Sequence, residues 1–287
     1  MRHEPATAAR PALSDRVRGI RDIAPESVLV LAGGRAILLQ LANPAVGHGV
    51  ARHSDFVSRP LARLHGTLSY VYAVTCGTPI DRAAAVRRVA LAHRPVHSDP
   101  ADHASAHHGA AGPAYNAFDP GLQLWVAATL YESATRMHDL VYGPLADADA
   151  ESVYRDYGVL GTALQVPAGL WPADRAAFAE YWRRASTELS TDATTRGVAE
   201  QLLHPRNGPL RLRLAMPLAR LVTTGLLTPG ERALFDLPWS ATRQRSFDLV
   251  LAGLRLVYPR LPARLRHAPM RHYLRVGRDT AARMRAE

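Results

Sequence analysis

The most restrictive feature of this 287-residue sequence is its helical period, because apolar residues recur three and four positions apart along almost the whole chain. Few windows alternate between apolar and polar residues, as half-buried strands do. With 47% hydrophobic residues, the chain can bury a sizeable core. We therefore predict an all-α fold, a single globular multi-helix domain. Its helices are expected over 26–43, 60–76, 80–93, 120–142, 147–164, 172–189, 209–224, 240–258 and 262–285.

Several of these boundaries carry local signals. Asp119 precedes Pro120, a pair typical of a helix cap and the first turn that follows it. Thr228 and Glu231 have the spacing of a capping box. Pro95 disfavours a helix that continues past residue 93, since the residue before a proline avoids the helical conformation.

No internal repeat or low-complexity linker divides the chain. We therefore expect an N-terminal extension over 1–24 and a single all-helical domain over 25–287. The charge is uneven, because residues 1–204 contain 19 Arg against 20 Asp and Glu, whereas residues 205–287 contain 16 against 5. The C-terminal helices are thus Arg-rich, and an electrostatic partner would meet this third of the chain.

Two residue types exclude whole classes of chemistry. The sequence has no lysine, so a Schiff-base lysine, a phosphate-loop lysine and a lysine general base are excluded. Cys76 is the single cysteine, which excludes an intrachain disulfide, a multi-cysteine zinc site and an iron–sulfur cluster held by this chain alone. The first 22 residues lack the apolar run of a secretory signal, and the longest apolar stretches are too short to span a membrane. We expect a cytoplasmic protein without a transmembrane segment.

Five of the thirteen histidines lie within sixteen residues, from His93 to His108. His93 and His97 have the spacing of a helical zinc pair, but the glutamate of the HExxH zinc-hydrolase motif is missing between them. His103, His107 and His108 lie among small and polar residues, a composition typical of an exposed loop. His93 differs because it ends an apolar helix. It is either a hydrogen-bonded core residue or a ligand.

Arg63 and Thr67 form a second group of candidates. They are four residues apart, so a helix places both on one face. There the arginine supplies a fixed cation for an anionic group, and the threonine supplies a hydroxyl for a polar ligand. The alternative is an arginine that faces solvent and a threonine that bonds back to its own helix.

Several segments carry a family resemblance through their order and spacing. They read LAGGRAILLQLANPAVGHGVARHSDF, RLHGTLSYVYAVTCG, the turn His93-Arg-Pro-Val96, YNAFDPGLQLWVAATLYES and ESVYRDYGVLGTALQVPAGLWPADRAAFAEYW. Over roughly residues 25–190 the chain resembles the catalytic domain of the MpaB and rubber-oxygenase (latex-clearing-protein) family.

The resemblance implies an all-helical fold around haem b, with His93 as the proximal iron ligand. The family's arginine and threonine near the haem fall on Arg63 and Thr67. It implies that Arg63 pairs with a haem propionate and that Thr67 donates a hydrogen bond to a propionate or to bound oxygen. His97 becomes a candidate residue of the pocket or of the surroundings that support the ligand. The implied partners are a hydrophobic small-molecule substrate and dioxygen, and no nucleic acid is expected.

This chain departs from the rubber oxygenases at several positions. Gly66 stands where they have a lysine just before the threonine as a distal ligand. Their catalytic glutamate has no counterpart, because no glutamate lies between residues 26 and 132, and Asp55 is the acid nearest to the expected region. Ala127 replaces a family histidine, and Ser98 replaces a glycine. These differences argue against cleavage of rubber itself.

We therefore expect a haem b-dependent oxygenase that oxidises a carbon–carbon double bond, with or without its cleavage. Its substrate would be a small hydrophobic molecule such as an isoprenoid or a natural-product intermediate. Two alternatives stay open. One is a haem-dependent enzyme that catalyses a rearrangement or dehydration without consuming oxygen. The other is a non-enzymatic helical protein whose basic C-terminal third binds nucleic acid or an anionic membrane.

Overall fold

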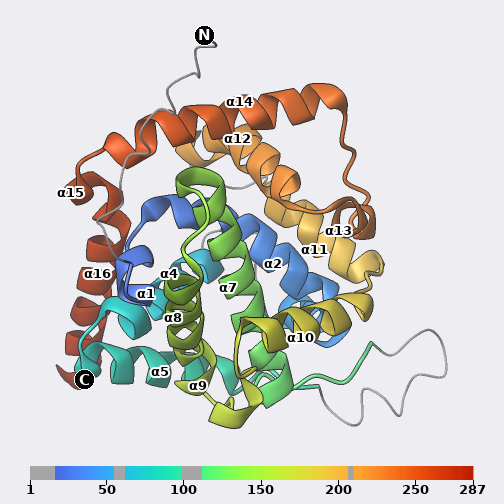
Figure 1. Cartoon of the computed structure of the whole chain (residues 1–287). Coiled ribbons are helices and arrows are strands. Elements are labelled where there is room, and N and C mark those ends of the chain that lie inside the picture. The colour runs from blue at the N-terminus through green and yellow to red at the C-terminus, as the bar shows by residue number, and fades with distance from the viewer. Residues whose placement is uncertain (1–16, 55–61, 99–111, 206–209, 287) are drawn as a thin grey trace, which may run out of the picture.

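The computed structural model describes residues 17–54, 62–98, 112–205 and 210–286 (Figure 1). Over these residues the chain is helical and forms no strand, although an isolated antiparallel bridge joins His97 and Asn116. The prediction of an all-α, multi-helix domain is confirmed.

In chain order, the elements are α1 (Ile20–Ile23), the 3-10 helix η1 (Ser27–Ala32), α2 (Gly33–Ala42), α3 (Pro44–His53), α4 (Ala62–Cys76), α5 (Pro79–His93), α7 (Pro120–Tyr142), α8 (Asp147–Tyr157), α9 (Val159–Thr162), η2 (Ala168–Leu170), α10 (Arg175–Thr187), α11 (Ala193–Leu203), α12 (Leu210–Leu226), α13 (Pro229–Leu234), α14 (Ala241–Val257), η3 (Tyr258–Arg260), α15 (Ala263–Arg266) and α16 (Ala268–Ala286).

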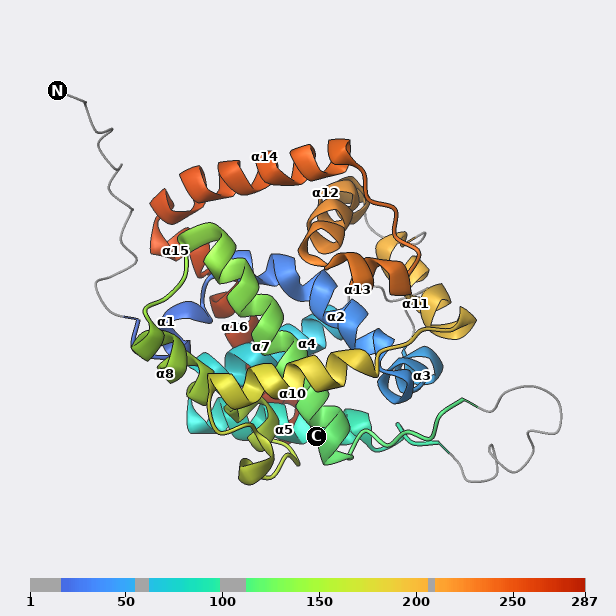
Figure 2. The same cartoon turned by 45° about the vertical axis from the view of Figure 1, so that its right-hand side comes forward.

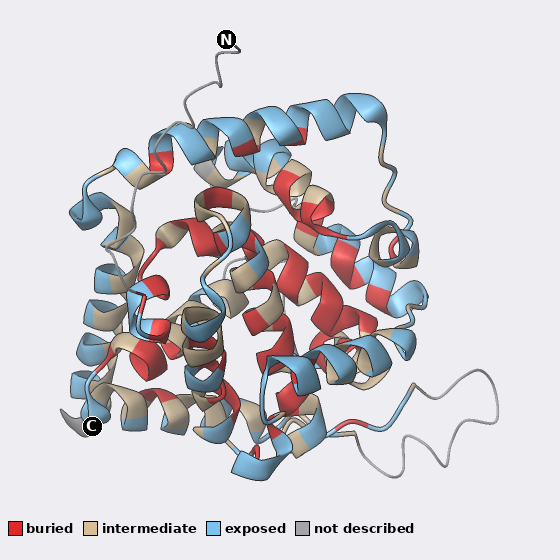
Figure 3. Cartoon of the chain, viewed as in Figure 1, coloured by how far each residue is buried: buried red, intermediate tan, exposed pale blue. Residues whose placement is uncertain are grey.

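The long helix α7 runs through the middle of the molecule and packs against η1 and α2 (Figures 1 and 2). It begins where predicted, because the Asp119 side chain accepts hydrogen bonds from the backbone N–H groups of Gly121 and Leu122. It ends at Tyr142, since Gly143 follows with a φ of 88° that favours glycine. Figure 3 shows that much of α2 and α7 is buried, as expected for helices at the centre of a core.

A second group of helices surrounds one end of α7. Helix α4 packs against α5, and α16 lies across both of them. The C-terminal helix therefore returns to the N-terminal half of the chain, where it forms part of the wall of the site described below.

Aromatic side chains fill the core between α7, α8 and α10. Tyr131 lies at their centre and meets its neighbours edge to face, with ring centroids 4.8–5.2 Å apart. These neighbours are Tyr154, Tyr157 and Phe178.

The segment before η1 contributes to the same core. Val17, Ile20 and Ile23 are buried in it, although they lie in the range predicted as an extension. The division into 1–24 and 25–287 stays a prediction, and the described residues show that the packed body includes side chains from residue 17 onward.

Two expected helices begin differently from the prediction. Residues 27–32 form a 3-10 turn, and the α-helix starts only at Gly33, where consecutive glycines lower the helical propensity. Gly34 also permits a close approach of α2 to α12, because a Cβ atom there would collide with the side chain of Thr223. In the range expected to form a helix over 172–189, α10 begins at Arg175 because Asp174 caps it.

Helix α11 is not among the expected helices. Its start is a capping box in which the Asp192 side chain accepts from the Thr195 N–H and the Thr195 hydroxyl accepts from the Asp192 N–H. The last residue of this box is threonine instead of the usual Glu or Gln, which explains why the sequence pattern is weak.

Two expected helices are divided in the structure. The range 147–164 contains α8 and α9, which meet at Gly158, and the range 262–285 contains α15 and α16. In the described part of the chain, no single helix is long and apolar enough to cross a membrane. The segments Ser27–Ala42 and Pro44–His53 reach the length and apolar composition of a membrane span only when they are taken together, and the chain bends by 106° between them.

Candidate active site

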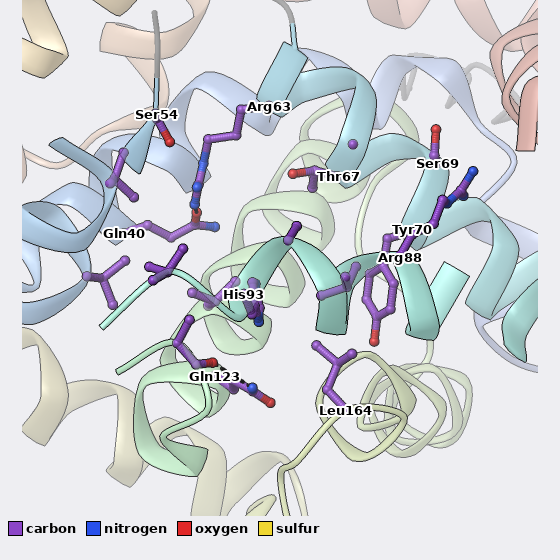
Figure 4. A pocket seen from close by; sticks show the side chains of 18 of the residues that line it. Gln40, Ser54, Arg63, Thr67, Ser69, Tyr70, Arg88, His93, Gln123 and Leu164 are labelled. Atoms are coloured by element: carbon purple, nitrogen blue, oxygen red, sulfur yellow. Dashed lines mark hydrogen bonds between the residues drawn. The ribbon is translucent and has the colours of Figure 1, made fainter. Parts of the chain in front are cut away.

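A cavity of about 720 Å³ lies among α4, α5 and α7, and residues of α2, α3, α9 and α16 also line it (Figure 4). Its volume is within the range of roughly 300–1,000 Å³ that is usual for small-molecule and cofactor sites. The lining contains all three residues predicted from the sequence, which are His93, Arg63 and Thr67.

His93 is the last residue of α5. This helix begins at a capping box, in which Thr78 and Asp81 bond to each other's backbone N–H, and it ends before Pro95 as expected. Residues 85, 88, 89, 92 and 93 all line the cavity, so one stripe of α5 faces it. His93 lies at the C-terminal end of this stripe.

The imidazole of His93 is half-buried and lies edge to face against Phe118, with ring centroids 6.2 Å apart. Its Nδ1 atom is buried and has no hydrogen-bond partner among the described residues. Burial lowers the pKa of His93 below 6.5, and the nearby charge of Arg63 lowers it further. The neutral imidazole that results is the form that coordinates a metal.

Arg63 and Thr67 lie one turn apart on α4 and both face the cavity. Arg63 Nη2 donates a hydrogen bond of 3.2 Å to Oε1 of Gln40. Burial lowers the pKa of Arg63 to about 10, so the guanidinium is still charged at neutral pH. Arg63 is half-buried and lines the cavity, which favours the site interpretation over that of a solvent-facing arginine.

Gln40 is a site residue that the sequence analysis does not predict. It comes from α2, where it is buried, and its Nε2 donates to Oγ1 of Thr129 on α7 at 3.0 Å while its Oε1 accepts from Arg63. Gln40 thus fixes the arginine to the central helices. A single signal is present in the sequence, namely a polar residue within the apolar run AILLQLA.

The contribution of α16 is also not predicted. The Arg-rich C-terminal helices are expected as a basic surface, yet α16 adds four residues to the lining. They are His272, Tyr273, Val276 and Thr280, spaced as one face of a helix.

The other predicted candidates lie elsewhere. His97 is exposed, its Nδ1 is 3.2 Å from the carbonyl oxygen of Arg94, and it does not belong to the cavity lining. His103, His107, His108 and Asp55 lie outside the described residues.

Two of the positions that depart from the family, Gly66 and Ala127, line the cavity. Nothing lies within 4 Å of the point where a Cβ atom of residue 66 would be, so a side chain at this position would begin in open space.

The donor set of the cavity limits the kind of metal centre it can hold. Over the described ranges, no three His, Cys, Asp or Glu side chains are placed to bind one metal ion. A haem iron needs only one protein ligand, for which a neutral histidine is suitable. The neutral imidazole of His93, the half-buried cation of Arg63 and the apolar walls fit this group, because they match its iron, its propionates and its ring.

Fold and site together define an all-α protein whose helices enclose a cavity lined by arginine and histidine side chains. Comparison with known proteins agrees with this class. Residues 20–256 match the family described as ER-bound oxygenase mpaB/B'/Rubber oxygenase, catalytic domain, and the chain belongs to this family. The predicted resemblance is confirmed and extends well beyond residue 190. Membership supports an oxygenase-type enzyme.

Two mycobacterial relatives are similar over most of their length. The uncharacterized proteins Mb2261 of Mycobacterium bovis and Rv2237 of Mycobacterium tuberculosis are each 43% identical to this chain over 236 residues. This alignment covers 79% of this chain and 88% of each relative. No solved structure matches the chain significantly.

Proposed function

We propose that this chain is a haem b-dependent oxygenase that oxidises a carbon–carbon double bond, with or without cleavage, in a small hydrophobic molecule such as an isoprenoid or a natural-product intermediate. The observation that carries the proposal is the placement of His93, with its lowered pKa, in the same cavity as Arg63 and Thr67. A neutral imidazole that lines a cavity is available to coordinate the iron of a haem bound there.

Each residue of the trio has a distinct task. His93 would hold the iron, because its low pKa keeps the imidazole unprotonated at neutral pH. Arg63 would pair with a propionate through its planar guanidinium, which Gln40 already orients. The Thr67 hydroxyl would donate a hydrogen bond to a propionate or to dioxygen in the cavity. Haem b, when bound, supplies the redox chemistry of its iron that activates dioxygen.

The apolar part of the lining would bind the substrate and exclude water. Val126, Leu130 and Leu164 contribute side chains without polar groups, so an unsaturated hydrocarbon chain packs there without desolvating a polar atom. The open space beside Gly66 suits a small molecule in the position of the lysine. Both features favour a compact apolar substrate over a polymer.

The proposal is tested by loading the purified protein with haemin and recording its absorption spectrum. We expect a Soret band typical of a histidine-bound haem, and we expect its loss or shift in His93→Ala. His97→Ala is the matched control. His97 lies four residues after His93 in an exposed position, so its replacement should leave the spectrum unchanged. A His93→Ala variant that binds haemin with an unaltered spectrum would contradict the assignment.

Oxygen consumption separates the proposal from a haem enzyme that only rearranges or dehydrates its substrate. Turnover of an unsaturated isoprenoid by the loaded protein should consume dioxygen in an oxygen-electrode measurement. Equal turnover without oxygen would favour the non-oxygenase alternative. A protein that binds no haemin, but binds nucleic acid or anionic vesicles with a steep salt dependence, would favour the non-enzymatic one.

A further inference from the structure

The charge of the cavity is strongly one-sided. Arg63 and Arg88 both line it, together with the histidines His53, His65, His93 and His272. No Asp or Glu is present among the described residues of the lining. A cavity with two fixed cations and no carboxylate of its own attracts anions.

Arg88 differs from the other arginines of this region. Arg82 donates to the carbonyl oxygen of Val74, and Arg278 forms a two-pronged pair with Asp81, with distances of 2.8 and 2.9 Å. Within the described part of the chain, Arg88 makes no hydrogen bond or ion pair. A half-buried guanidinium without an acceptor is an available binding group, since its donors fit a carboxylate in a fixed geometry.

The position of Arg88 is set by α5 and α16. It lies on the cavity-facing stripe of α5, five residues before His93, which corresponds to about 7.5 Å along the helix axis. Its Nη2 atom is 3.6 Å from the point where a Cβ atom of Gly277 would lie, so the guanidinium rests against the surface of α16 at a residue without a side chain.

Arg88 and Arg63 serve different parts of the cavity. In Figure 4, Arg88 and Ser69 lie on the opposite side of the view from Arg63 and Gln40, with Thr67 between the two groups. The neighbouring lining residues from α16 include His272 and Thr280, whose polar atoms suit an anion. The two arginines are therefore separate anchors and do not share one ligand group.

We propose that Arg88 is a second carboxylate-binding point of the cavity. The carboxylate comes from one of two sources, either the second propionate of haem or the acid group of an otherwise apolar substrate. The first source rests on the proposed function, whereas the second does not require haem to be bound. In either case the preferred ligands of the cavity are amphipathic acids, and Arg88 determines this preference.

The experiment compares Arg88→Gln with Arg87→Gln in binding titrations. Arg87 is the neighbouring arginine on α5, but it is exposed and lies outside the cavity lining, so its replacement removes the same net charge without touching the site. The probes are haemin, haemin dimethyl ester, farnesoic acid and farnesol. Haemin and its dimethyl ester share one skeleton, as farnesoic acid and farnesol do. In each pair only the first member carries free carboxylates.

If Arg88 binds a propionate, Arg88→Gln weakens haemin about tenfold or more and leaves the dimethyl ester unchanged. If it binds a substrate acid, the same variant leaves haemin unchanged and weakens farnesoic acid, but not farnesol, by a similar factor. Arg88→Lys should retain part of the affinity, because the charge remains while the two-pronged geometry is lost. Circular dichroism verifies that each variant is folded.

Equal behaviour of Arg88→Gln and Arg87→Gln with all four probes would overturn the proposal. Failure of the wild-type protein to bind haemin overturns the proposed function alone. The acid and alcohol probes are therefore also titrated into the haem-free protein, where Arg88 is tested without the cofactor. A wild-type protein that does not prefer either charged probe to its neutral partner also overturns the role of Arg88.

Discussion

His93 links the electrostatics of single residues to the chemistry of the site. Its pKa is below 6.5 because the imidazole is buried and because Arg63 lies nearby. When the pH falls below 6.5, the unfolded chain binds a proton at this histidine before the folded protein does. Protonation of His93 therefore favours unfolding in acid. Above pH 6.5 this histidine does not lower the free energy of unfolding, and the free energy of unfolding falls as the pH decreases from 6.5 towards the pKa of His93 in the folded state.

The first residue-scale prediction concerns the pair His93 and Arg63. In Arg63→Gln, the pKa of His93 should rise towards 6.5, because one of its two causes of depression is removed. The titration is followed by NMR of labelled histidine in the haem-free protein, with the exposed His97 as an internal control. A His93 pKa that stays constant or falls would show that Arg63 does not act on it.

The sequence predicts some site residues better than others for a physical reason. His93 is found because a helix end and a following proline single it out from four neighbouring histidines, and the family resemblance assigns Arg63 and Thr67. Gln40 and Arg88 are not found, because a polar residue within a helical pattern is equally compatible with solvent and with a cavity. Only the packing of α2 and α16 decides between these environments.

At the scale of elements, the short helix α13 is held by one carboxylate with two tasks. Glu231 Oε2 accepts from the Thr228 backbone N–H at 2.8 Å, which completes the predicted capping box. Its Oε1 accepts from Nη2 of Arg35 at 3.0 Å. Arg35 is 1% exposed and also pairs with Glu132 of α7, so α2, α7 and α13 meet at one buried guanidinium.

We predict that Glu231→Ala destabilises the protein more than Thr228→Ala does. The loss of the Thr228 cap costs about 1 kcal/mol, whereas Glu231→Ala also removes a carboxylate from a buried cation, at a cost of about 3 kcal/mol in total. Urea unfolding monitored by circular dichroism measures both variants. Equal losses would mean that Glu231 serves the cap alone and that Glu132 is sufficient for Arg35.

Elements are predicted well where local signals are strong and poorly where tertiary contacts decide. Asp119 and Gly143 bracket α7, and both ends agree with the prediction. The 3-10 turn over 27–32 has the apolar pattern of a helix, but its conformation depends on packing against α7 and α12. The threonine in the capping box of α11 gives too weak a signal for the sequence to reveal that helix.

At the scale of the whole molecule, the cavity depends on a wall that comes from the far end of the chain. The family match ends at residue 256, yet α16 lines the cavity and packs against α4 and α5. The Asp81–Arg278 pair ties α16 to the start of α5. The preceding helix α15 contacts the N-terminal segment through the pair Arg266–Glu26, so the two ends of the described chain pack against each other.

Glu26 is the central residue of this contact between the two ends of the described chain. Its carboxylate is 2% exposed, accepts from the Tyr142 hydroxyl at 2.8 Å, lies 3.0 Å from His267 Nε2 and pairs with the guanidinium of Arg266. Replacement by the isosteric glutamine leaves Arg266 without its counter-charge in a largely buried position. Because a buried pair that loses one partner costs about 3–5 kcal/mol, and Arg266 is partly exposed, we expect a loss of about 2–3 kcal/mol in Glu26→Gln.

The last prediction is that this loss is transmitted to the cavity. In Glu26→Gln, amide hydrogen exchange should accelerate over 263–286, and the affinity for haemin should fall because α16 supplies part of the lining. Glu200→Gln is the control, since within the described residues the Glu200 carboxylate pairs only with His204 and both side chains are exposed. Faster exchange confined to residues around 26, with α16 and haemin affinity unaffected, would contradict this coupling. It would mean that α16 is held by α4 and α5 alone.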